Sequence, residues 1–404
     1  MNIKRVSKVD VPEDDVTRKI RNLNAKSPEG SAARRIQFAR TGGYDVLHTV
    51  HRMPEVAESL ARAIQGRRAL VVTTPTVGRN VTRPLVAECA ARLNRRIPTM
   101  VLPCSEEQKT QESVNAICTA VLEAGLDREA VLIVVGGGVC LDLATMAAVS
   151  IRRGLAQIRV PTTLVGQVDA GIGVKGSLNF RGRKSYLGCY LPPELVLVNQ
   201  GFLAGLPARH FRAGLAEIVK MAIVADDILF SLLEREPLFT PEHFASNGGN
   251  SRTIVWRSIA SLLDELERNL FEDQAHERLA DFGHTFSPII ESASGFEVVH
   301  GEAVAIDIAL STELATCVGI LPGDARDRIL ALLRRLSLPT FSPVLTLEQS
   351  LRAMNAARDH RRGLMNLILP CAIGRGFCVA ESSAIPPTAL RTALERLPRD
   401  IVVP

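Results

Sequence analysis

Short apolar runs alternate with helical patterns over much of the first half of this chain. Three of these runs have the length and the β-branched content of buried strands, and they cover residues 66–75, 99–104 and 130–138. Between them, residues 81–96 and 113–127 repeat their apolar side chains with the period of an amphipathic helix. Strands that alternate with helices form a parallel sheet covered by helices on both faces. The sequence therefore predicts an α/β domain here.

The second half of the chain has a different pattern. Long helical patterns dominate after residue 200, and few segments resemble strands. Because 404 residues are enough for two domains, we predict an α/β domain over residues 44–200 and a mostly helical domain over residues 201–404. Residues 1–43 are polar and are predicted to be an N-terminal extension. The predicted fold class is α/β, a Rossmann-like parallel-sheet domain followed by a mostly α-helical one.

Composition excludes several classes of protein. Hydrophobic residues make up 46% of the chain and charged residues 23%, which is typical of a globular protein. Only 4% of the residues are aromatic, and the net charge of +5 is spread along the chain, so nothing supports nucleic-acid binding. No apolar run approaches the length of a membrane span, and the N-terminus lacks the apolar core of a signal peptide. The eight cysteines form no CxxC pair and favour reduced thiols in a cytoplasmic protein.

Two histidines, His284 and His300, each stand beside a glycine where a helical pattern begins. Their spacing fits no short metal-binding motif, and two histidines satisfied by backbone groups are the ordinary alternative. Upstream, however, Glu217 offers a third ligand. One carboxylate and two imidazoles form a chemically sensible catalytic zinc set, with one coordination position left open for substrate.

The segment GLAEIVK places Glu217 and Lys220 three residues apart, on one face of a predicted helix. A surface ion pair is the common interpretation of such a pair. Here the neighbouring residues are apolar almost all round the helix, which predicts burial. Buried charges need a partner or a metal, so the pattern favours a functional site.

A glycine triplet, Gly136 to Gly138, follows the most apolar strand-like run and precedes a helical pattern. Such a turn can present backbone N–H groups to phosphate oxygens, and a tight βα turn without ligand is the alternative. Residues 158–193 then mix glycines with cations. They are predicted to form a loop around an anionic ligand, with Lys175 and Lys184 on phosphate or cofactor and Asp169 on a hydroxyl; a solvated hairpin is the alternative.

Five motifs in order resemble the sugar phosphate cyclases, the family of 3-dehydroquinate synthase. They are GGGVCLD, RVPTTLVGQVDAGIGVK, GLAEIVK, DFGHTFSP and HGEAVAID, and the resemblance extends over about residues 45–380. It implies an active site in the cleft between a Rossmann-like domain and a helical domain. It also implies tightly held NAD, a catalytic Zn2+ (with Co2+ as the alternative), a small sugar phosphate as substrate and a homodimer.

The resemblance also implies roles for individual residues. Lys175 and Lys220 would hold phosphate and oxyanions, and Asp169 would orient a hydroxyl or the metal water. Asp281 and His360 would read sugar hydroxyls. The metal ligands would be Glu217, His284 and His300. The cofactor contacts would be Glu106, Lys109, Gly137, Gly138, Asp142, Thr162, Thr163 and Lys184.

Departures from 3-dehydroquinate synthase point to a subgroup. Asp281 replaces an asparagine, Pro288 a histidine and Leu263 a lysine, while His360 and Asn366 replace a lysine-rich pattern. These changes resemble the cyclases of sedoheptulose 7-phosphate, which has no carboxylate, and most closely the 2-epi-5-epi-valiolone synthases. The implied reaction is transient oxidation by NAD, phosphate elimination, re-reduction and intramolecular aldol closure, for C7-cyclitol natural products.

Three residues, Gly176, Ser185 and Thr74, depart from the family pattern near the expected cofactor and phosphate contacts. They leave open a sister cyclase that makes 2-epi-valiolone. The motifs are also compatible with a 3-dehydroquinate synthase, with a polyol dehydrogenase of this fold and with a non-catalytic NAD-binding descendant. The intact metal set argues against the descendant without catalysis.

Overall fold

The structure, a computed structural model, describes residues 42–49, 53–272, 278–360, 364–399 and 403. The predicted extension over residues 1–43 lies almost wholly outside these residues, so it remains a prediction, as do the domain limits. All the elements given below belong to one unit, Gly43–Pro404.

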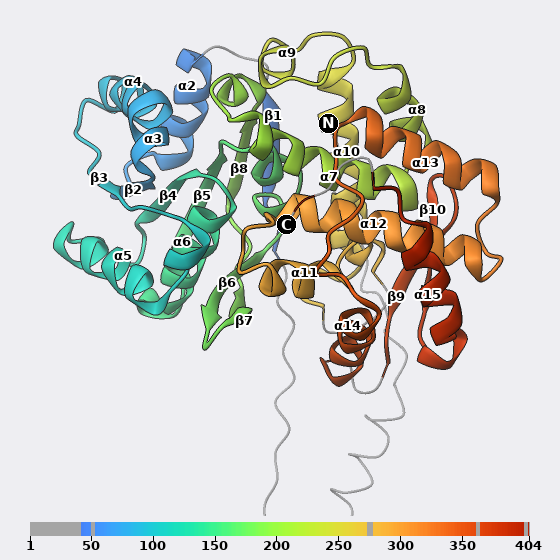
Figure 1. Cartoon of the computed structure of the whole chain (residues 1–404). Coiled ribbons are helices and arrows are strands. Elements are labelled where there is room, and N and C mark those ends of the chain that lie inside the picture. Colours follow the sequence, from blue (N-terminus) through green and yellow to red (C-terminus); the bar gives the residue numbers. More distant parts are fainter. Residues whose placement is uncertain (1–41, 50–52, 273–277, 361–363, 400–402, 404) are drawn as a thin grey trace, which may run out of the picture. The chain divides into compact units, whose positions relative to one another are not determined.

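A six-stranded parallel sheet lies in the first half of this unit (Figure 1). Its strands follow the order β1-β8-β5-β4-β2-β3, and each neighbouring pair is parallel. The strands are β1 (Asp45–Thr49), β2 (Ala69–Thr73), β3 (Thr99–Val101), β4 (Val131–Gly136), β5 (Ala156–Pro161) and β8 (Leu195–Asn199). The sheet confirms the predicted α/β class.

Helices cover both faces of the sheet because the central strands are apolar on both sides. All six residues of β4 are buried. Leu132 and Val134 pack with helices α5 (Gln111–Glu123) and α6 (Gly138–Ser150). The alternate residues of β4 pack with helices α2 (Met53–Ile64) and α4 (Arg83–Leu93). A strand buried on both faces reads as a continuous apolar run, which is the pattern that the sequence shows.

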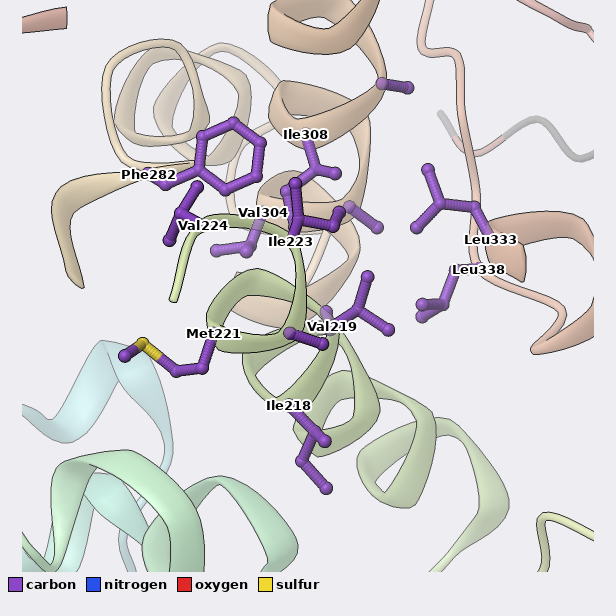
Figure 2. Packing of buried hydrophobic residues seen from close by; sticks show 14 of the residues in the cluster. Ile218, Val219, Met221, Ile223, Val224, Phe282, Val304, Ile308, Leu333 and Leu338 are labelled. Carbon is purple, nitrogen blue, oxygen red and sulfur yellow. The ribbon is translucent and has the colours of Figure 1, made fainter. Parts of the chain in front are cut away.

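The second half is mainly helical, as predicted. Its α-helices are α7 (Ala208–Val224), α8 (Asp227–Arg235), α9 (Pro241–Ala245), α10 (Ser251–Arg268), α11 (Ser287–Ala293), α12 (His300–Cys317), α13 (Gly323–Arg335), α14 (Leu347–His360) and α15 (Pro387–Arg396). Helix α12 is buried continuously over residues 301–315. Figure 2 shows Val304 and Ile308 of α12 packed near Val224 and Ile223 of α7, with Phe282 beside them. Two buried helices thus form the centre of this half.

Short elements connect the main ones. They are α3 (Pro75–Val77), η1 (Gly78–Thr82), η2 (Glu106–Gln108), η3 (Ile151–Arg153), η4 (Gly166–Ala170), η5 (Gln200–Leu203), η6 (Leu279–Asp281) and η7 (Ser382–Ala384). Within the described residues, no helix is both long enough and apolar enough to cross a membrane.

The structure differs from the sequence-based expectation in three segments. Residues 158–193 are not one loop, since they begin inside buried strand β5. Their later part forms the antiparallel hairpin β6 (Lys175–Phe180) and β7 (Arg183–Tyr190), which agrees with the alternative of a solvated hairpin. Residues 210–234, one of the long helical patterns of the second half, divide between α7 and α8, because the side chain of Asp226 accepts a hydrogen bond from Leu229 N and begins a new helix. A second hairpin, β9 (Leu367–Ala372) and β10 (Arg375–Val379), was not predicted.

Candidate active site

Glu217, His284 and His300 come together although they lie on three different elements. Glu217 is on buried helix α7, His284 precedes α11, and His300 is the first residue of α12. Their potential ligand atoms all lie within 4.8 Å of one another. Glu217 Oε1 lies 3.0 Å from His300 Nε2 and 4.0 Å from His284 Nε2. One carboxylate oxygen therefore faces the Nε2 atom of both rings, which is the arrangement that a bound cation requires.

The other nitrogen of each ring holds the ring in place. Nδ1 of His284 donates to the carbonyl of Phe282 at 3.0 Å. Nδ1 of His300 donates to Oε1 of Glu291, a residue of α11, at 3.1 Å. Partners of this kind select the tautomer that leaves Nε2 free to bind a metal. Glu291 is a residue of this cluster that the sequence analysis missed; its one local signal is an acidic residue in the apolar run of α11.

The donor set fits a divalent metal. Both oxygens of Glu217 are buried, and neither accepts a hydrogen bond of good geometry. Burial raises the pKa of Glu217, but Lys220, with the two histidines, outweighs it and holds the pKa well below its usual value. Burial, together with Lys220, lowers the pKa of His284, which favours the neutral ring that ligates metals. A buried, charged carboxylate that faces two oriented imidazoles is a donor set that suits a zinc or cobalt ion.

Two glycines allow helix α7 to approach its neighbours closely. A Cβ on Gly301, the second residue of α12, would lie 2.2 Å from the carbonyl oxygen of Ala213 on α7. A Cβ on Gly214 would lie 2.4 Å from Cβ of Leu164, which follows β5. Only glycine fits such contacts without a shift of backbone. The Gly301 contact brings together the helices that carry His300 and Glu217, and the Gly214 contact brings α7 against the segment after β5.

Lys220 connects the candidate metal ligand Glu217 to Asp169 in the first half of the chain. Its ammonium lies 2.7 Å from Glu217 Oε2 and 3.5 Å from Asp169 Oδ1. The side chain is 2% exposed, so this charge is held by its partners rather than by water. Burial lowers the pKa of Lys220, but Asp169 and Glu217 outweigh it and raise the pKa. The predicted burial and pairing of Glu217 with Lys220 are confirmed.

Several predicted cofactor contacts meet in a second cluster. Lys109 Nζ lies 2.6 Å from Asp142 Oδ2 and 3.3 Å from Ser185 Oγ. Glu106 Oε1 accepts a hydrogen bond from Nδ2 of Asn179 at 2.9 Å. The side chains come from the loop after β3, from α6 and from the β6–β7 hairpin. Three segments far apart in sequence thus converge.

The glycine turn lies beside this cluster. Gly137 is the N-cap of α6 and Gly138 its first residue. A Cβ on Gly137 would lie 2.8 Å from Cγ2 of Thr163, whose hydroxyl accepts a hydrogen bond from Gly166 N at 3.1 Å. Thr162 is buried, and its Oγ1 has no hydrogen-bond partner. The first N–H groups of a 13-residue helix have no intrahelical partner and favour anions. The turn therefore fits the phosphates of a dinucleotide.

Lys175 and Asp281 belong to a third cluster. Lys175 Nζ lies 2.6 Å from Glu272 Oε1, and its side chain is 55% exposed. Arg278 also pairs with Glu272 and lies 4.0 Å from Asp281 Oδ1. The sequence reasoning missed Glu272 and Arg278. Of the remaining predicted residues, His360 ends α14, and its side chain lies outside the described residues.

The lysines beyond residue 41 are concentrated at the candidate site. Beyond residue 41 the sequence contains four lysines, and all of them belong to the clusters above. Lys184, expected on the cofactor, pairs with Glu291, and the other three pair with Asp142, Glu272 and Glu217. Arginine supplies the rest of the positive charge over these residues. The site can therefore present compact ammonium groups to phosphate, each one already beside a carboxylate.

Arg159 fixes the segment between the glycine turn and Lys175. Its side chain is fully buried on β5. The guanidinium donates to Gln157 Oε1 at 2.7 Å, to Thr145 Oγ1 at 3.1 Å and to Leu191 O at 3.3 Å, and also to the carbonyls of Gly171 and Gly173. These bonds tie α6, the turn after Asp169 and the end of the hairpin together.

Comparisons with known proteins agree with this geometry. The family model described as 3-dehydroquinate synthase N-terminal matches residues 99–213, and the one described as 3-dehydroquinate synthase C-terminal matches residues 214–360. The 2-epi-5-epi-valiolone synthase of Streptomyces glaucescens is 40% identical over 345 residues, which are 84% of this chain and 88% of that one. The enzyme of the same name from Streptomyces hygroscopicus subsp. jinggangensis is 38% identical over 363 residues, 87% of each chain.

A solved structure is also similar. It is that of 2-epi-5-epi-valiolone synthase from Streptomyces hygroscopicus subsp. jinggangensis 5008 with NAD+ and Zn2+ bound. It matches with a TM-score of 0.84 at 37% identity and covers 90% of this chain and 98% of that chain.

Proposed function

The chain belongs to the 3-dehydroquinate synthase family of sugar phosphate cyclases, and from that premise we propose that it converts sedoheptulose 7-phosphate to 2-epi-5-epi-valiolone with release of phosphate. The observation that carries the proposal is the convergence of Glu217, His284 and His300 beside Lys220 and Asp169. Relatives named 2-epi-5-epi-valiolone synthase are 37–42% identical over most of the chain, which supports the proposed reaction.

We assign the metal to Glu217, His284 and His300, where Zn2+ or Co2+ would polarise the hydroxyl and carbonyl oxygens of the substrate. Lys220 lies against the ligand Glu217, so its ammonium is placed to stabilise an oxyanion that develops there. Asp169, 3.5 Å from that ammonium, is placed to orient a substrate hydroxyl. Lys175 and Asp281 share a cluster with Arg278 and would bind phosphate and hydroxyl groups.

We place NAD at the turn of Gly137 and Gly138, where it would take a hydride from the substrate and return it later. Thr163 lies against Gly137, and Lys109 pairs with Asp142 of α6, the helix that begins at this turn. Thr162 offers an unpartnered hydroxyl, and Glu106 contacts Asn179 of the hairpin. We assign all five to the cofactor site. Lys184 contacts Glu291 instead, so its place in the cofactor site rests on the family pattern alone. We also propose a role for His360 in reading a sugar hydroxyl, on the same ground.

We propose a homodimer and a cytoplasmic location as well. Both follow the family pattern. Reduced, scattered cysteines agree with a reducing compartment, since the described cysteines are all free thiols.

The leading alternative is 3-dehydroquinate synthase itself, whose substrate carries a carboxylate. Leu263 on α10 and Pro288 in the first turn of α11 supply no charge or hydrogen-bond donor for that group. An enzyme that must bind a carboxylate needs such donors. These two residues therefore favour a sugar phosphate that has no carboxylate. A sister cyclase that makes 2-epi-valiolone would differ in product stereochemistry.

The test is incubation with sedoheptulose 7-phosphate, NAD and Zn2+ or Co2+. We expect phosphate release without net NADH, and NMR should identify 2-epi-5-epi-valiolone. His284→Ala and His300→Ala should abolish activity and metal retention in a folded chain, whereas His210→Ala, an exposed histidine of α7, should not. Turnover of the heptulosonate substrate of 3-dehydroquinate synthase in place of sedoheptulose 7-phosphate would overturn the proposal.

A further inference from the structure

A basic cavity lies at the opposite end of the parallel sheet from the glycine turn. Its volume is about 240 Å³, and the residues that line it include Arg68, Arg95, Arg96, Ile97, Pro98 and Leu126. We propose that this cavity is a second anion site, which binds one phosphate group, either free or at the end of a small phosphate monoester. The site goes beyond the proposed function and does not depend on it.

The cavity lies at the amino ends of strands β2 and β4. Arg68 directly precedes β2, and its carbonyl accepts a hydrogen bond at 2.9 Å from the backbone N–H of Val131, the first residue of β4. The glycine turn follows the other end of β4, at Gly136. The ends of this six-residue strand are roughly 17 Å apart, since a strand rises about 3.3 Å per residue. The cavity is therefore separate from the candidate active site.

Backbone carbonyls hold two of the three arginines in place. Nη1 of Arg68 donates to the carbonyl of Gly125, just after α5, at 2.6 Å. Nη2 of Arg95 donates to the carbonyl of Arg67. A guanidinium group has five N–H donors, so most donors of both arginines are left for another acceptor. These two groups are therefore oriented before an anion arrives, and the exposed side chain of Arg96 lies on the same lining.

No carboxylate neutralises the three arginines. The lining contains no acidic side chain, and within the part of the chain that the structure describes Arg68, Arg95 and Arg96 form no salt bridge. The arginines that flank them in sequence differ, since each of these has an acidic partner: Arg62 pairs with Glu58, Arg67 with Glu194 and Arg92 with Glu88. The positive charge of the lining is therefore left for a bound anion.

The neighbouring helices offset this charge only in part. Helices α4 and α5 both end at the cavity, at Leu93 and Glu123. The C-terminus of a helix carries about −0.5 of an elementary charge, so the two ends together supply about −1 against the three positive charges of the arginines. The side chains of Glu123 and Asp127 are exposed and do not line the cavity. The balance at the lining stays positive and favours a dianion.

Phosphate is the anion that this lining suits best. The planar fork of a guanidinium group binds two phosphate oxygens at once. Ile97, Pro98 and Leu126 supply an apolar part of the lining, where the carbon chain of an ester can lie. The volume of about 240 Å³ is below the range of about 300–1,000 Å³ that is typical of pockets for drug-sized ligands. One phosphate group on a small molecule therefore fits, whereas a dinucleotide does not.

The first experiment soaks tungstate, a phosphate analogue that is easily located by X-ray diffraction, into crystals of the full chain whose lattice leaves the cavity free. We expect a tungstate peak in contact with the guanidinium groups of Arg68, Arg95 and Arg96. The peak should disappear in the double variant Arg68→Gln/Arg96→Gln and weaken in Arg96→Gln, which removes no hydrogen bond to the backbone. Arg92→Gln is the matched control, because Arg92 lies nearby on α4 but pairs with Glu88.

The second experiment measures binding in solution by equilibrium dialysis with radiolabelled inorganic phosphate. Arg96→Gln should weaken phosphate binding at this site about tenfold, because one charge-assisted contact is lost. Unlabelled phosphate and glycerol 3-phosphate then compete for the site. Stronger displacement by glycerol 3-phosphate assigns the site to monoesters, and stronger displacement by phosphate assigns it to the free anion.

The outcomes separate this inference from the proposed function. A cavity without a tungstate peak, a peak that the double variant keeps, or a peak that Arg92→Gln loses overturns the inference. Phosphate affinity that is unchanged in Arg96→Gln also overturns it, and this variant decides the matter if the double variant does not fold. Tungstate beside Lys175 or Lys220 is scored separately, since its absence counts against the proposed function and leaves the result at the cavity intact.

Discussion

Glu291 accepts a hydrogen bond from Nδ1 of His300 at 3.1 Å, and its second oxygen pairs with the ammonium of Lys184. Burial raises the pKa of Glu291, but the His300 ring and Lys184 outweigh it and lower the pKa to about 2. The carboxylate is therefore charged and fixes the ring whose Nε2 faces Glu217. It also connects the β6–β7 hairpin to His300, one of the candidate metal ligands.

We expect Glu291→Gln to lower metal affinity about 10- to 100-fold, because the amide leaves the His300 ring less basic and less firmly oriented. Excess metal should restore most of the activity. Metal affinity can be measured by competition with a chromophoric chelator. Ser292→Ala, at an exposed neighbour on α11, should retain wild-type affinity. Equal affinity for Glu291→Gln and wild type would show that this contact does not support the metal.

Gly301→Ala should impair both stability and metal binding. The new Cβ would lie 2.2 Å from the carbonyl oxygen of Ala213, so α12 must move away from α7. Overpacking of this kind costs about 1–3 kcal/mol, and it shifts His300 relative to Glu217. Thermal unfolding and metal content measure the two effects. The control is Gly323→Ala at the start of α13, where an added Cβ meets nothing within 4 Å.

Asp307 should make stability depend on pH. Its Oδ2 accepts hydrogen bonds from the backbone N–H groups of Phe286 and Ser287, which fixes the start of α11. Burial outweighs these bonds and raises the pKa of Asp307 to about 6, against about 3.9 in an unfolded chain. The folded state binds the Asp307 proton more tightly than the unfolded chain does. The stability that this proton contributes is therefore complete below about pH 4 and is lost as the pH rises to 6.

The measurement is the free energy of unfolding in urea, with chelator present, for wild type and Asp307→Asn. Two pKa units correspond to about 3 kcal/mol. The wild type should therefore lose about that much relative to the variant between pH 4 and pH 7. Asp324→Asn, at an exposed position on α13, should track the wild type. If the difference in free energy of unfolding between wild type and Asp307→Asn stays constant from pH 4 to pH 7, the prediction is wrong.

Arg159→Lys should destabilise the chain by about 3 kcal/mol or more. A lysine cannot reproduce the fork of five donors, so buried acceptors such as the carbonyls of Gly173 and Leu191 lose their partners, at about 1–3 kcal/mol each. Activity should also fall, because the turn that carries Asp169 loses the hydrogen bonds that fix it. Thermal unfolding and kcat measure both effects. Arg92→Lys, in a surface pair on α4, should change stability by less than about 0.5 kcal/mol.

Local patterns predicted the features that depend on local physics. The alternation of strands and helices indicated the parallel sheet, because both faces of the central strands must be covered. The apolar surroundings of Glu217 and Lys220 predicted a buried pair. Hairpin β9–β10 was missed since its strands are short and contain Pro370 and Gly376, which usually weaken strands.

Other parts of the site depend on packing between distant segments. Glu291 of α11 faces His300 of α12, and Asp307 of α12 accepts a hydrogen bond from the backbone at the start of α11. Likewise, Lys184 meets Glu291 through the path of the β6–β7 hairpin. No short sequence pattern predicts these two contacts, because the residues of each pair are brought together by the fold. The ligands could be named from the motif, whereas the groups that orient them required the fold.

The lysines of the site are already paired with carboxylates. Each of the four holds a carboxylate: Lys109 holds Asp142, Lys175 holds Glu272, Lys184 holds Glu291 and Lys220 holds Glu217. We expect a substrate phosphate to compete with the carboxylate for such a lysine, so that binding is an ion exchange rather than a simple addition. A dianion wins this exchange more readily than a monoanion. Below about pH 6, where phosphate monoesters gain a proton, the incoming group loses that advantage over the carboxylate it has to displace.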